Sequence, residues 1–328
     1  MAEAVLAVAF AGPHVSVQDA GRPGLMRFGV PASGPLDRQA FAAAHLALGN
    51  PPDAPAIEVS LGGLVLTCQS GEVGFAVAGG GFVVEHGASR RGSWTVATLR
   101  AGERLAIRPG HWGSWCYLAF AGALQSPLWL GRAATHALSG LGGGRLTAGQ
   151  VWRVAGTRAV REGAFPCPVF ARPRQDLRVT IGPQDRFFAP ETLDTFLHAP
   201  WRITEAWDRM GVRLAGPQVA PQAALDMLSE PTLRGSVQVA GDGVASVLLA
   251  DHQTTGGYPK IATVLDCDLD AMVQLRPRDL LRFTVVSPAE AVQIARAEAG
   301  RRHRYRETLA RAAGGAGPFG DGLASLPP

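Results

Sequence analysis

The densest group of chemically useful residues in the 328-residue chain is the segment Ala250–Ile261, with the sequence ADHQTTGGYPKI. Its candidate substrate-binding and catalytic residues are Gln253, Thr254, Thr255, Gly256, Gly257, Tyr258 and Lys260. Gly256 and Gly257 can adopt positive φ and would then turn successive backbone N–H groups toward one point, forming an anion-binding nest. Such a nest could hold a carboxylate, a phosphate or a developing oxyanion. The same residues also fit a plain hairpin, and the spacing leaves both interpretations open.

Two further segments combine glycine, proline and charged residues. The first is Val17–Gly24, which continues in Gly29–Asp37, and the second is Asp208–Pro217, which is followed by Ser229 and Glu230. Both are too rich in glycine and proline for ordinary strands. The polar side chains that they offer to a substrate are Gln18, Asp19, Arg22, Ser33, Asp37, Arg209 and Glu230.

Several candidates have a structural role open to them as well as a chemical one. Asp19 and Arg22 stand on either side of a turn, where they can pair with each other. Asp37 lies in the first turn of an expected helix, where a carboxylate offsets the helix dipole. Glu58 lies in an apolar strand, so its carboxylate should be either paired or functional.

The candidate catalytic set consists of Lys260, Gln253, Arg209 and Glu230. Arg209 can present a planar fork to a carboxylate. Glu230 can serve as a general base, although Ser229-Glu230-Pro231 is also a good turn sequence. Histidines such as His45 are expected to have packing or surface positions.

Composition argues against several kinds of chemistry. Of the 31 basic residues, 30 are arginine, and the one lysine follows Pro259, so the chain has no Walker A loop and we expect no ATP site of that type. The GxSxG and HExxH motifs are absent, and the four cysteines are too widely spaced to indicate a zinc site or a disulfide framework.

The arginines are mostly scattered, so we expect neither nucleic acid nor a membrane as partner. The first twelve residues lack the basic region of a secretory signal, which favours the cytoplasm.

The elements that carry these segments are mostly short strands. Apolar runs of four to eight residues recur between glycine and proline breaks, as in sandwiches and barrels. The expected strands include Leu64–Cys68, Val73–Ala78, Phe82–Glu85, Trp94–Leu99, Arg104–Ile107, Trp115–Phe120, Leu177–Ile181, Val237–Ala240, Val247–Ala250, Ile261–Leu265 and Leu281–Val286.

Helices are expected to be few, and a proline-rich linker is expected between two strand-rich halves. The first helix should run from Pro35 to Leu48, with Ser33 available as cap and Gly49 as its left-handed stop. Pro190–His198 and the stretch from Pro288 to about Ala313 also predict helices. The linker is expected at Phe165–Pro173.

The three chemical segments together resemble the signature of one family. Gln18–Gly24, Gly29–Arg38, Ile57–Gly63, Asp208–Pro217, Leu228–Pro231 and Ala250–Ile261 are similar to the motifs of the KipA family, also called allophanate hydrolase subunit 2 or biotin-dependent carboxyltransferase family proteins. The resemblance spans residues 5–290. The family accepts arginine or lysine at position 260, which implies that a positive charge is needed there. We expect Lys260 to be an exposed surface residue. It varies at position 252, so His252 is discounted.

The resemblance implies an all-β fold of two cyclophilin-like β-barrel halves. We expect an N-terminal barrel over residues 1–165, a C-terminal barrel over 174–288, and a helical, partly disordered tail over 289–328. The resemblance also implies that the chain is a subunit of an ATP-dependent 5-oxoprolinase, which opens 5-oxo-L-proline to L-glutamate. The implied partners are a KipI-like subunit and a LamB/YcsF-like subunit.

Two alternatives remain open under the same resemblance. One is a carboxyltransferase component of a urea carboxylase or allophanate system, with carboxybiotin as cofactor. The other is a non-catalytic regulator that sequesters KipI, an inhibitor of a kinase. Under the main interpretation the chain binds no cofactor by itself, and ATP is used by the complex.

Overall fold

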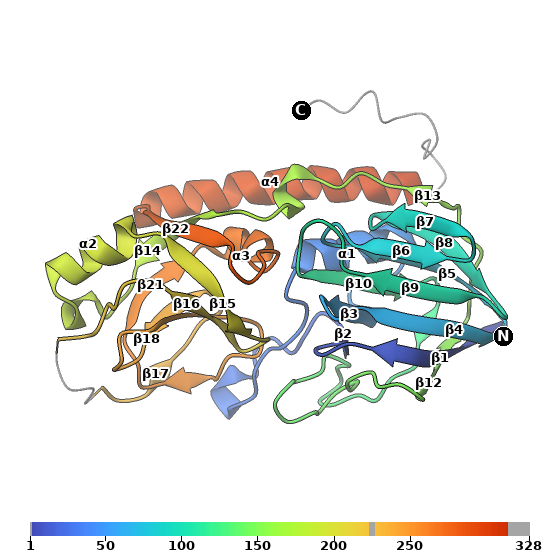
Figure 1. Ribbon diagram of the computed structural model, residues 1–328, viewed down its shortest axis with the longest axis horizontal. Coiled ribbons are helices and arrows are strands. Elements are labelled where there is room, and N and C mark those ends of the chain that lie inside the picture. Colours follow the sequence, from blue (N-terminus) through green and yellow to red (C-terminus); the bar gives the residue numbers. More distant parts are fainter. Residues whose placement is uncertain (1, 223–226, 314–328) are drawn as a thin grey trace. The chain divides into compact units, whose positions relative to one another are not determined.

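The computed structural model describes residues 2–222 and 227–313, which form two compact units (Figure 1). Unit 1 comprises the described residues of 1–21, 37–172 and 301–328, and unit 2 comprises those of 22–36 and 173–300. The division after Arg172 falls in the expected linker. Residues 22–36, which we expected in the N-terminal domain, belong to unit 2, and the expected tail is divided after Gly300. Residues 314–328 of that tail lie outside the described residues.

Unit 1 contains two antiparallel sheets. Their strand orders are β11-β12-β1-β4-β9-β6-β7 and β13-β8-β5-β10-β3-β2. The strands are β1 (Glu3–Ala11), β2 (Ser16–Gln18), β3 (Ala56–Ser60), β4 (Leu64–Ser70), β5 (Glu72–Ala78), β6 (Val83–His86), β7 (Ser89–Gly92), β8 (Thr95–Arg100), β9 (Arg104–Arg108), β10 (Trp115–Phe120), β11 (Ala123–Leu124), β12 (Val151–Ala155) and β13 (Gly163–Ala164).

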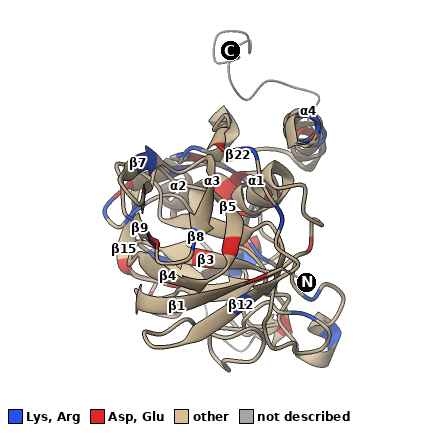
Figure 2. Ribbon diagram, turned by 90° about the vertical axis from the view of Figure 1, so that its right-hand side faces the viewer, with Lys and Arg blue, Asp and Glu red and all other residues tan. Residues whose placement is uncertain are grey.

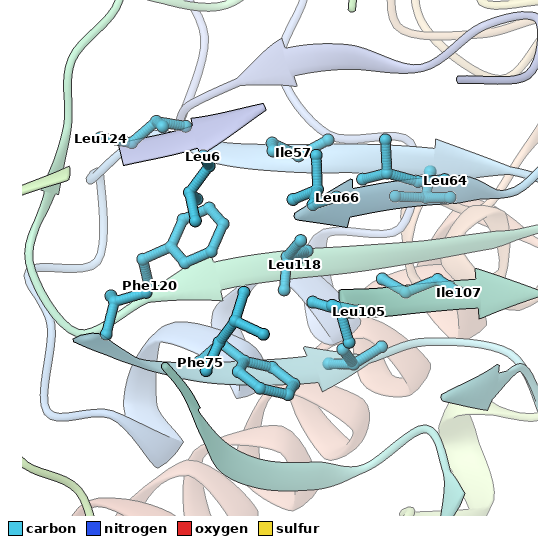
Figure 3. Close-up of a cluster of buried hydrophobic side chains, with 14 of the residues drawn as sticks. Leu6, Ile57, Leu64, Leu66, Phe75, Leu105, Ile107, Leu118, Phe120 and Leu124 are labelled. Atoms are coloured by element: carbon cyan, nitrogen blue, oxygen red, sulfur yellow. The ribbon is translucent and has the colours of Figure 1, made fainter. Parts of the chain in front are cut away.

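The core of unit 1 follows from the two-residue period of its central strands. On β5 and β10, Phe75, Val77, Leu118 and Phe120 belong to one apolar cluster shared by the two sheets (Figure 3). The alternate residues on these strands, including Ala76 and Ala119, face a second cluster formed with the helix α1 (Arg38–Ala47). Both faces of β5 and β10 are therefore buried, and the small alanines let the helix pack closely against the sheet.

Unit 2 contains a closed barrel with the strand order β14-β21-β18-β19-β16-β15-β22. The first and last strands close it by parallel pairing, with Asp176 opposite Arg282 and Val179 opposite Val285. Its strands, together with the small β17-β20 ladder, are β14 (Asp176–Ile181), β15 (Trp201–Trp207), β16 (Gly211–Ala215), β17 (Glu230–Pro231), β18 (Ser236–Val239), β19 (Ala245–Leu248), β20 (Thr255–Gly256), β21 (Lys260–Val264) and β22 (Leu280–Val285).

The remaining helices are short, except for the last one. They are η1 (Met26–Phe28), η2 (Val169–Ala171), η3 (Asp185–Phe187), α2 (Pro190–His198), α3 (Asp266–Met272) and α4 (Pro288–Ala313). The C-terminal part of α4 packs into unit 1, where Leu309 joins the α1 cluster and the Tyr305 hydroxyl donates to the Pro166 carbonyl at 2.6 Å. None of the helices in the described ranges has the length and apolarity needed to cross a membrane.

Charged residues are spread over many strands. In Figure 2 the blue of β7 comes from Arg90 and Arg91, and strands such as β1, β5 and β9 also carry charged residues. A run of basic residues near the C-terminus lies on α4, where Arg306 donates to Gln39 at 3.0 Å.

The predicted mainly-β architecture is confirmed, with two corrections in detail. Asp37, not Ser33, caps α1, because its carboxylate accepts the N–H groups of Gln39 and Ala40. Gly49 has φ 64° and provides the expected left-handed stop. Gly211–Ala215, which we judged too glycine-rich for a strand, forms β16, because Val212 and Leu214 are buried and alternate with residues that are exposed or half-buried.

Unit 1 should lose stability in mild acid because of His45. This side chain is fully buried on α1, and burial lowers its pKa to about 4. The folded state therefore binds fewer protons than the unfolded state, so the stabilisation is complete above pH 6.5 and is lost as the pH falls toward 4. We expect the free energy of unfolding in urea to fall by about 2 kcal/mol between pH 6.5 and pH 5 from this residue.

The variant His45→Gln should flatten that pH dependence, whereas His198→Gln should leave it unchanged because His198 is exposed. A His45→Gln protein with the same pH slope as the wild type would contradict the assignment.

Candidate functional site

A cluster of polar side chains lies at one end of the unit 2 barrel. Lys260 is the first residue of β21, Gln238 lies near the end of β18, and Gln184 follows β14. Glu230, in the β17-β20 ladder, and Gln253, just before that ladder, complete it. We call these five residues the amide cluster, because three of them are glutamines.

Lys260 is the buried cation of the cluster. Its side chain is 5% exposed, and its Nζ has no hydrogen-bond partner among the described residues. The Glu230 carboxylate is 3.8 Å away, beyond hydrogen-bond distance. A buried ammonium is costly without acceptors, so this position favours a ligand that supplies an oxygen.

Gln184 fixes the position of both charged residues. Its Oε1 accepts the Lys260 backbone N–H at 3.0 Å, and its Nε2 donates to Glu230 Oε2 at 2.5 Å. The Glu230 side chain is 42% exposed, so it can reach both Lys260 and solvent. A carboxylate in this position can accept an N–H from a substrate or act as a base toward it.

Gln238 faces the same cluster from the neighbouring strand. Its Oε1 accepts from Gln253 Nε2 at 3.0 Å, while its own Nε2 is buried without a partner among the described residues. Gly256 lies directly against this amide, since a Cβ on Gly256 would come within 2.6 Å of Gln238 Nε2. The cluster thus contains two buried donors, on Lys260 and Gln238, and one carboxylate.

His252 borders the cluster, although we discounted it from the sequence. Its Nδ1 lies 3.0 Å from the Thr232 hydroxyl, which in turn donates to the Gln253 carbonyl. Burial is the main cause that lowers the pKa of His252, and the nearby Arg234 lowers it further. A neutral imidazole here helps to fix the loop that carries Gln253.

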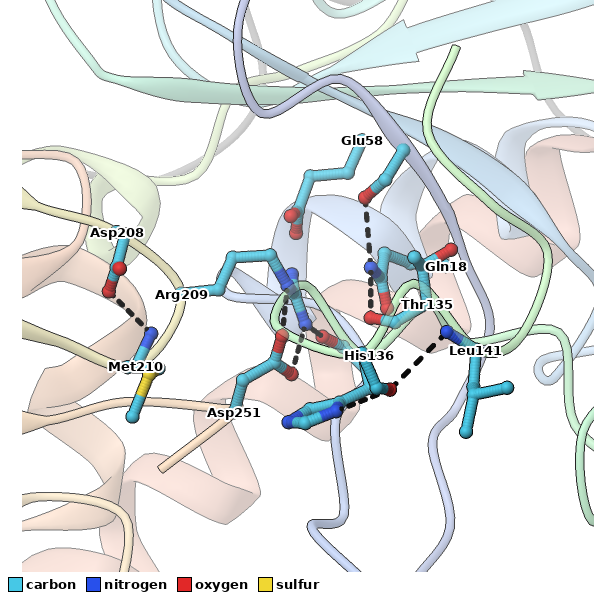
Figure 4. Close-up of polar contacts among 12 residues, drawn as sticks. Gln18, Glu58, Thr135, His136, Leu141, Asp208, Arg209, Met210 and Asp251 are labelled. Atoms are coloured by element: carbon cyan, nitrogen blue, oxygen red, sulfur yellow. Dashed lines mark hydrogen bonds and ion pairs between the residues drawn. The ribbon is translucent and has the colours of Figure 1, made fainter. Parts of the chain in front are cut away.

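Arg209 and Asp251 form a buried ion pair that fixes the same loop. Their side chains are 1% and 0% exposed, and the guanidinium donates from Nε and Nη2 to the two carboxylate oxygens at 3.0 Å each (Figure 4). Nη2 also donates to the Gly34 carbonyl at 2.6 Å. The fork that we expected to bind a substrate is therefore occupied by Asp251 and Gly34, which points to a positioning role.

The candidates in unit 1 are held by contacts within that unit. Gln18 Nε2 donates to Ser16 and to the Thr135 carbonyl (Figure 4), and the Asp19 carboxylate accepts the N–H groups of Gly21 and Ala133. The fully buried Glu58 carboxylate accepts the Tyr117 hydroxyl at 2.7 Å. Burial and the nearby Glu58 raise the pKa of that tyrosine well above its usual value. These contacts give the carboxylates of Asp19 and Glu58 a structural role.

The segment Ala250–Ile261 differs from our expectation in two respects. Neither Gly256 nor Gly257 has positive φ, so the nest, one of the two interpretations that the spacing left open, does not form, and Gly256 pairs with Glu230 in the β17-β20 ladder. Lys260 is buried, whereas we treated it as a surface residue. Thr255 and Tyr258 are exposed, and Thr254 is half-buried.

Arg22 and Ser33 belong to unit 2. Arg22 is buried, and its backbone N–H donates to the Ala32 carbonyl at 2.7 Å. Ser33 has φ 53°, a left-handed conformation that is uncommon for serine. No group of three or more His, Cys, Asp or Glu residues in the described part of the chain is arranged to hold a metal ion.

Comparison with known proteins shows the family. The model of the carboxyltransferase domain, subdomains A and B, matches residues 28–285, and the chain belongs to this family. It is similar to the C component of 5-oxoprolinase from Haemophilus influenzae (34% identity over 86% of this chain and 92% of that protein). It is also similar to the same component from Escherichia coli (32% identity over 93% of this chain and 98% of that protein).

A solved structure supports the same assignment. The crystal structure of the Kluyveromyces lactis urea carboxylase matches 94% of this chain with a TM-score of 0.81 and 26% identity. This chain spans only 30% of that protein. The resemblance to the carboxyltransferase family is thereby confirmed.

The ion pair should dominate the stability of unit 2. Asp251→Asn removes one buried charge and leaves the Arg209 guanidinium without its carboxylate, so we expect a loss of about 3–5 kcal/mol in the free energy of unfolding. The exposed pair of Arg153 and Glu3 provides the control, because Glu3→Gln should cost less than about 1 kcal/mol. Urea unfolding measures both. A loss for Asp251→Asn as small as that of the control would show that the pair is not structural.

Proposed function

We propose that this chain is a subunit of an ATP-dependent 5-oxoprolinase complex, which opens 5-oxo-L-proline to L-glutamate. Two relatives named as a component of 5-oxoprolinase match the chain at 34% and 32% identity, over nearly their whole lengths. The amide cluster supports the proposal because it offers groups that suit a planar amide. The partners we propose are a KipI-like subunit and a LamB/YcsF-like subunit.

The observation that carries the proposal is the buried ammonium of Lys260. Hydrolysis of a lactam adds water to the carbonyl carbon and breaks the ring C–N bond, and the carbonyl oxygen gains negative charge on the way. A cation that is already desolvated and fixed stabilises this charge more strongly than a solvated one does. Glu230, 3.8 Å from Lys260, would accept the ring N–H.

A second candidate is the carboxyltransferase component of a biotin-dependent urea carboxylase. The TM-score of 0.81 to the Kluyveromyces lactis urea carboxylase favours it. Urea is also a planar amide whose oxygen would gain charge, so the same cluster would serve. Carboxybiotin would then be the donor of the carboxyl group, and a biotinylated carrier would have to be supplied by another chain.

Reconstitution separates the two candidates. The chain is combined with the KipI-like and LamB/YcsF-like subunits, and glutamate is measured after addition of 5-oxo-L-proline and ATP. We expect glutamate only when all three chains and ATP are present. If the complex forms without turnover, and urea-dependent carboxyl transfer appears instead with a biotinylated carrier, the first candidate is wrong.

Lys260 variants test the role of the cluster in that complex. We expect Lys260→Arg to keep most of the activity, because the family resemblance implies that either cation serves. Lys260→Ala should lose about 10²–10³-fold in kcat, as when one preorganised oxyanion donor is removed. Thermal unfolding of each variant establishes that it is folded. Turnover by folded Lys260→Ala within threefold of wild type, about 0.65 kcal/mol in barrier height, would exclude the site.

A further inference from the structure

Two buried donors of unit 2 are cross-strand partners. Gln238 on β18 pairs with Lys260 on β21 because the register shifts by one residue between Val237 and Gln238, with Ile261 as the extra residue. Such a bulge redirects a side chain, and directly opposed residues project from the same face of a sheet. Both residues are 4% exposed, and neither Gln238 Nε2 nor Lys260 Nζ has a hydrogen-bond partner among the described residues.

The orientation of the Gln238 amide is fixed by its neighbour. Gln253 Nε2 donates to Gln238 Oε1 at 3.0 Å, so the NH₂ group of Gln238 is directed away from Gln253. The Gln253 carbonyl in turn accepts from the Thr232 hydroxyl, which fixes the Gln253 backbone. An amide held in this way is preorganised as a donor, which lowers the entropy lost when a ligand binds.

Gly256 leaves room for the Gln238 amide, which packs directly against it. A Cβ at this position would come within 2.6 Å of Gln238 Nε2 and within 3.2 Å of the Thr232 methyl group. Since Gly256 does not have positive φ, its backbone conformation does not require glycine. The requirement for glycine is therefore steric and concerns the Gln238 amide.

We propose that Gln238 Nε2 and Lys260 Nζ together bind one oxygen-bearing planar group of the substrate, and that Gln238 is a specificity-determining residue. The proposal rests on the proposed function in placing the substrate at the amide cluster. A carboxylate or an amide carbonyl can accept from both donors, whereas an amine or a hydrocarbon cannot. Gln253 acts as a positioning residue, through Gln238.

The experiment uses the fact that Lys260 is the only lysine in the chain. Labelling with ¹³C,¹⁵N-lysine gives one set of side-chain NMR signals, which reports on the Nζ environment without further assignment. The full-length chain is titrated with 5-oxo-L-proline, urea and acetate, alone and with the unlabelled partner subunits. We expect at least one of the three probes to shift the Lys260 signals in a saturable manner.

Variants identify the contribution of Gln238. Gln238→Met keeps the side-chain length and removes the donor, and it should weaken binding of that probe about tenfold or more, as expected for a lost hydrogen bond in a buried site. Gly256→Ala should have a similar effect with little change in melting temperature, because the nearest atoms that its Cβ would meet belong to side chains and not to the backbone. Gln175→Met, at an exposed position of unit 2, is the matched control and should bind like wild type.

The outcomes separate this proposal from the proposed function. If a probe binds and Gln238→Met and Gly256→Ala bind it as well as wild type, the two-donor site is wrong while the lactam-opening function stands. If acetate or urea binds in a Gln238-dependent manner but the reconstituted complex makes no glutamate, the two-donor site stands and the proposed function fails. If none of the three probes shifts the Lys260 signals in either state, the two-donor site is overturned.

Discussion

The buried ion pair between Arg209 and Asp251 is the interaction on which the geometry of unit 2 depends. A charge pair that is almost fully removed from water is stable only if its hydrogen bonds are complete, and here both carboxylate oxygens and the Gly34 carbonyl accept from one guanidinium. The pair joins the β15–β16 turn to the residue that begins the loop of Gln253. It also holds residues 22–36 against the same unit, which explains why two charged motifs far apart in the sequence belong together.

The strands that form the cores could be predicted from the sequence because burial leaves a simple pattern. On β5 and β10 every residue but Glu72 is buried, so the apolar runs are continuous and bounded by glycine. β16 was missed because it has only five residues, begins at Gly211, is followed by Gly216 and has Arg213 at its centre. The α3 helix was missed for a related reason: Asp266, Asp268 and Asp270 suggest a loop, yet Asp268 is buried against Arg174 and Arg178, which compensate its charge.

The candidate site could be predicted only in part. Residues inside the glycine-rich motifs are conspicuous in the sequence, whereas single polar residues in or beside ordinary strands are not. Glu230, Gln253, Gly256 and Lys260 stand in glycine-rich segments that attracted attention, and the structure brings them together. Gln184 and Gln238 lie outside those segments and were missed. Gln238 did leave a signal, since a glutamine between Val237 and Val239 in a buried strand must have a partner or a ligand. Arg209 looked like a substrate fork because the sequence could not reveal that Asp251 occupies it.

Gly256 shows how the same residue type can be required for different reasons. From the sequence, positive φ in a nest was one of two interpretations left open for Gly256, and the structure attributes the glycine instead to the space that the Gln238 amide occupies. This difference matters for the chemistry. A nest of backbone N–H groups would bind any small anion, whereas a fixed amide and a buried ammonium, with Glu230 nearby, present two donors and one acceptor at once. Such a combination matches the C=O and N–H edge of an amide better than it matches a simple anion, because Glu230 repels a second negative charge and accepts an N–H. Selection for an amide over an anion thus follows from the charge balance of the cluster.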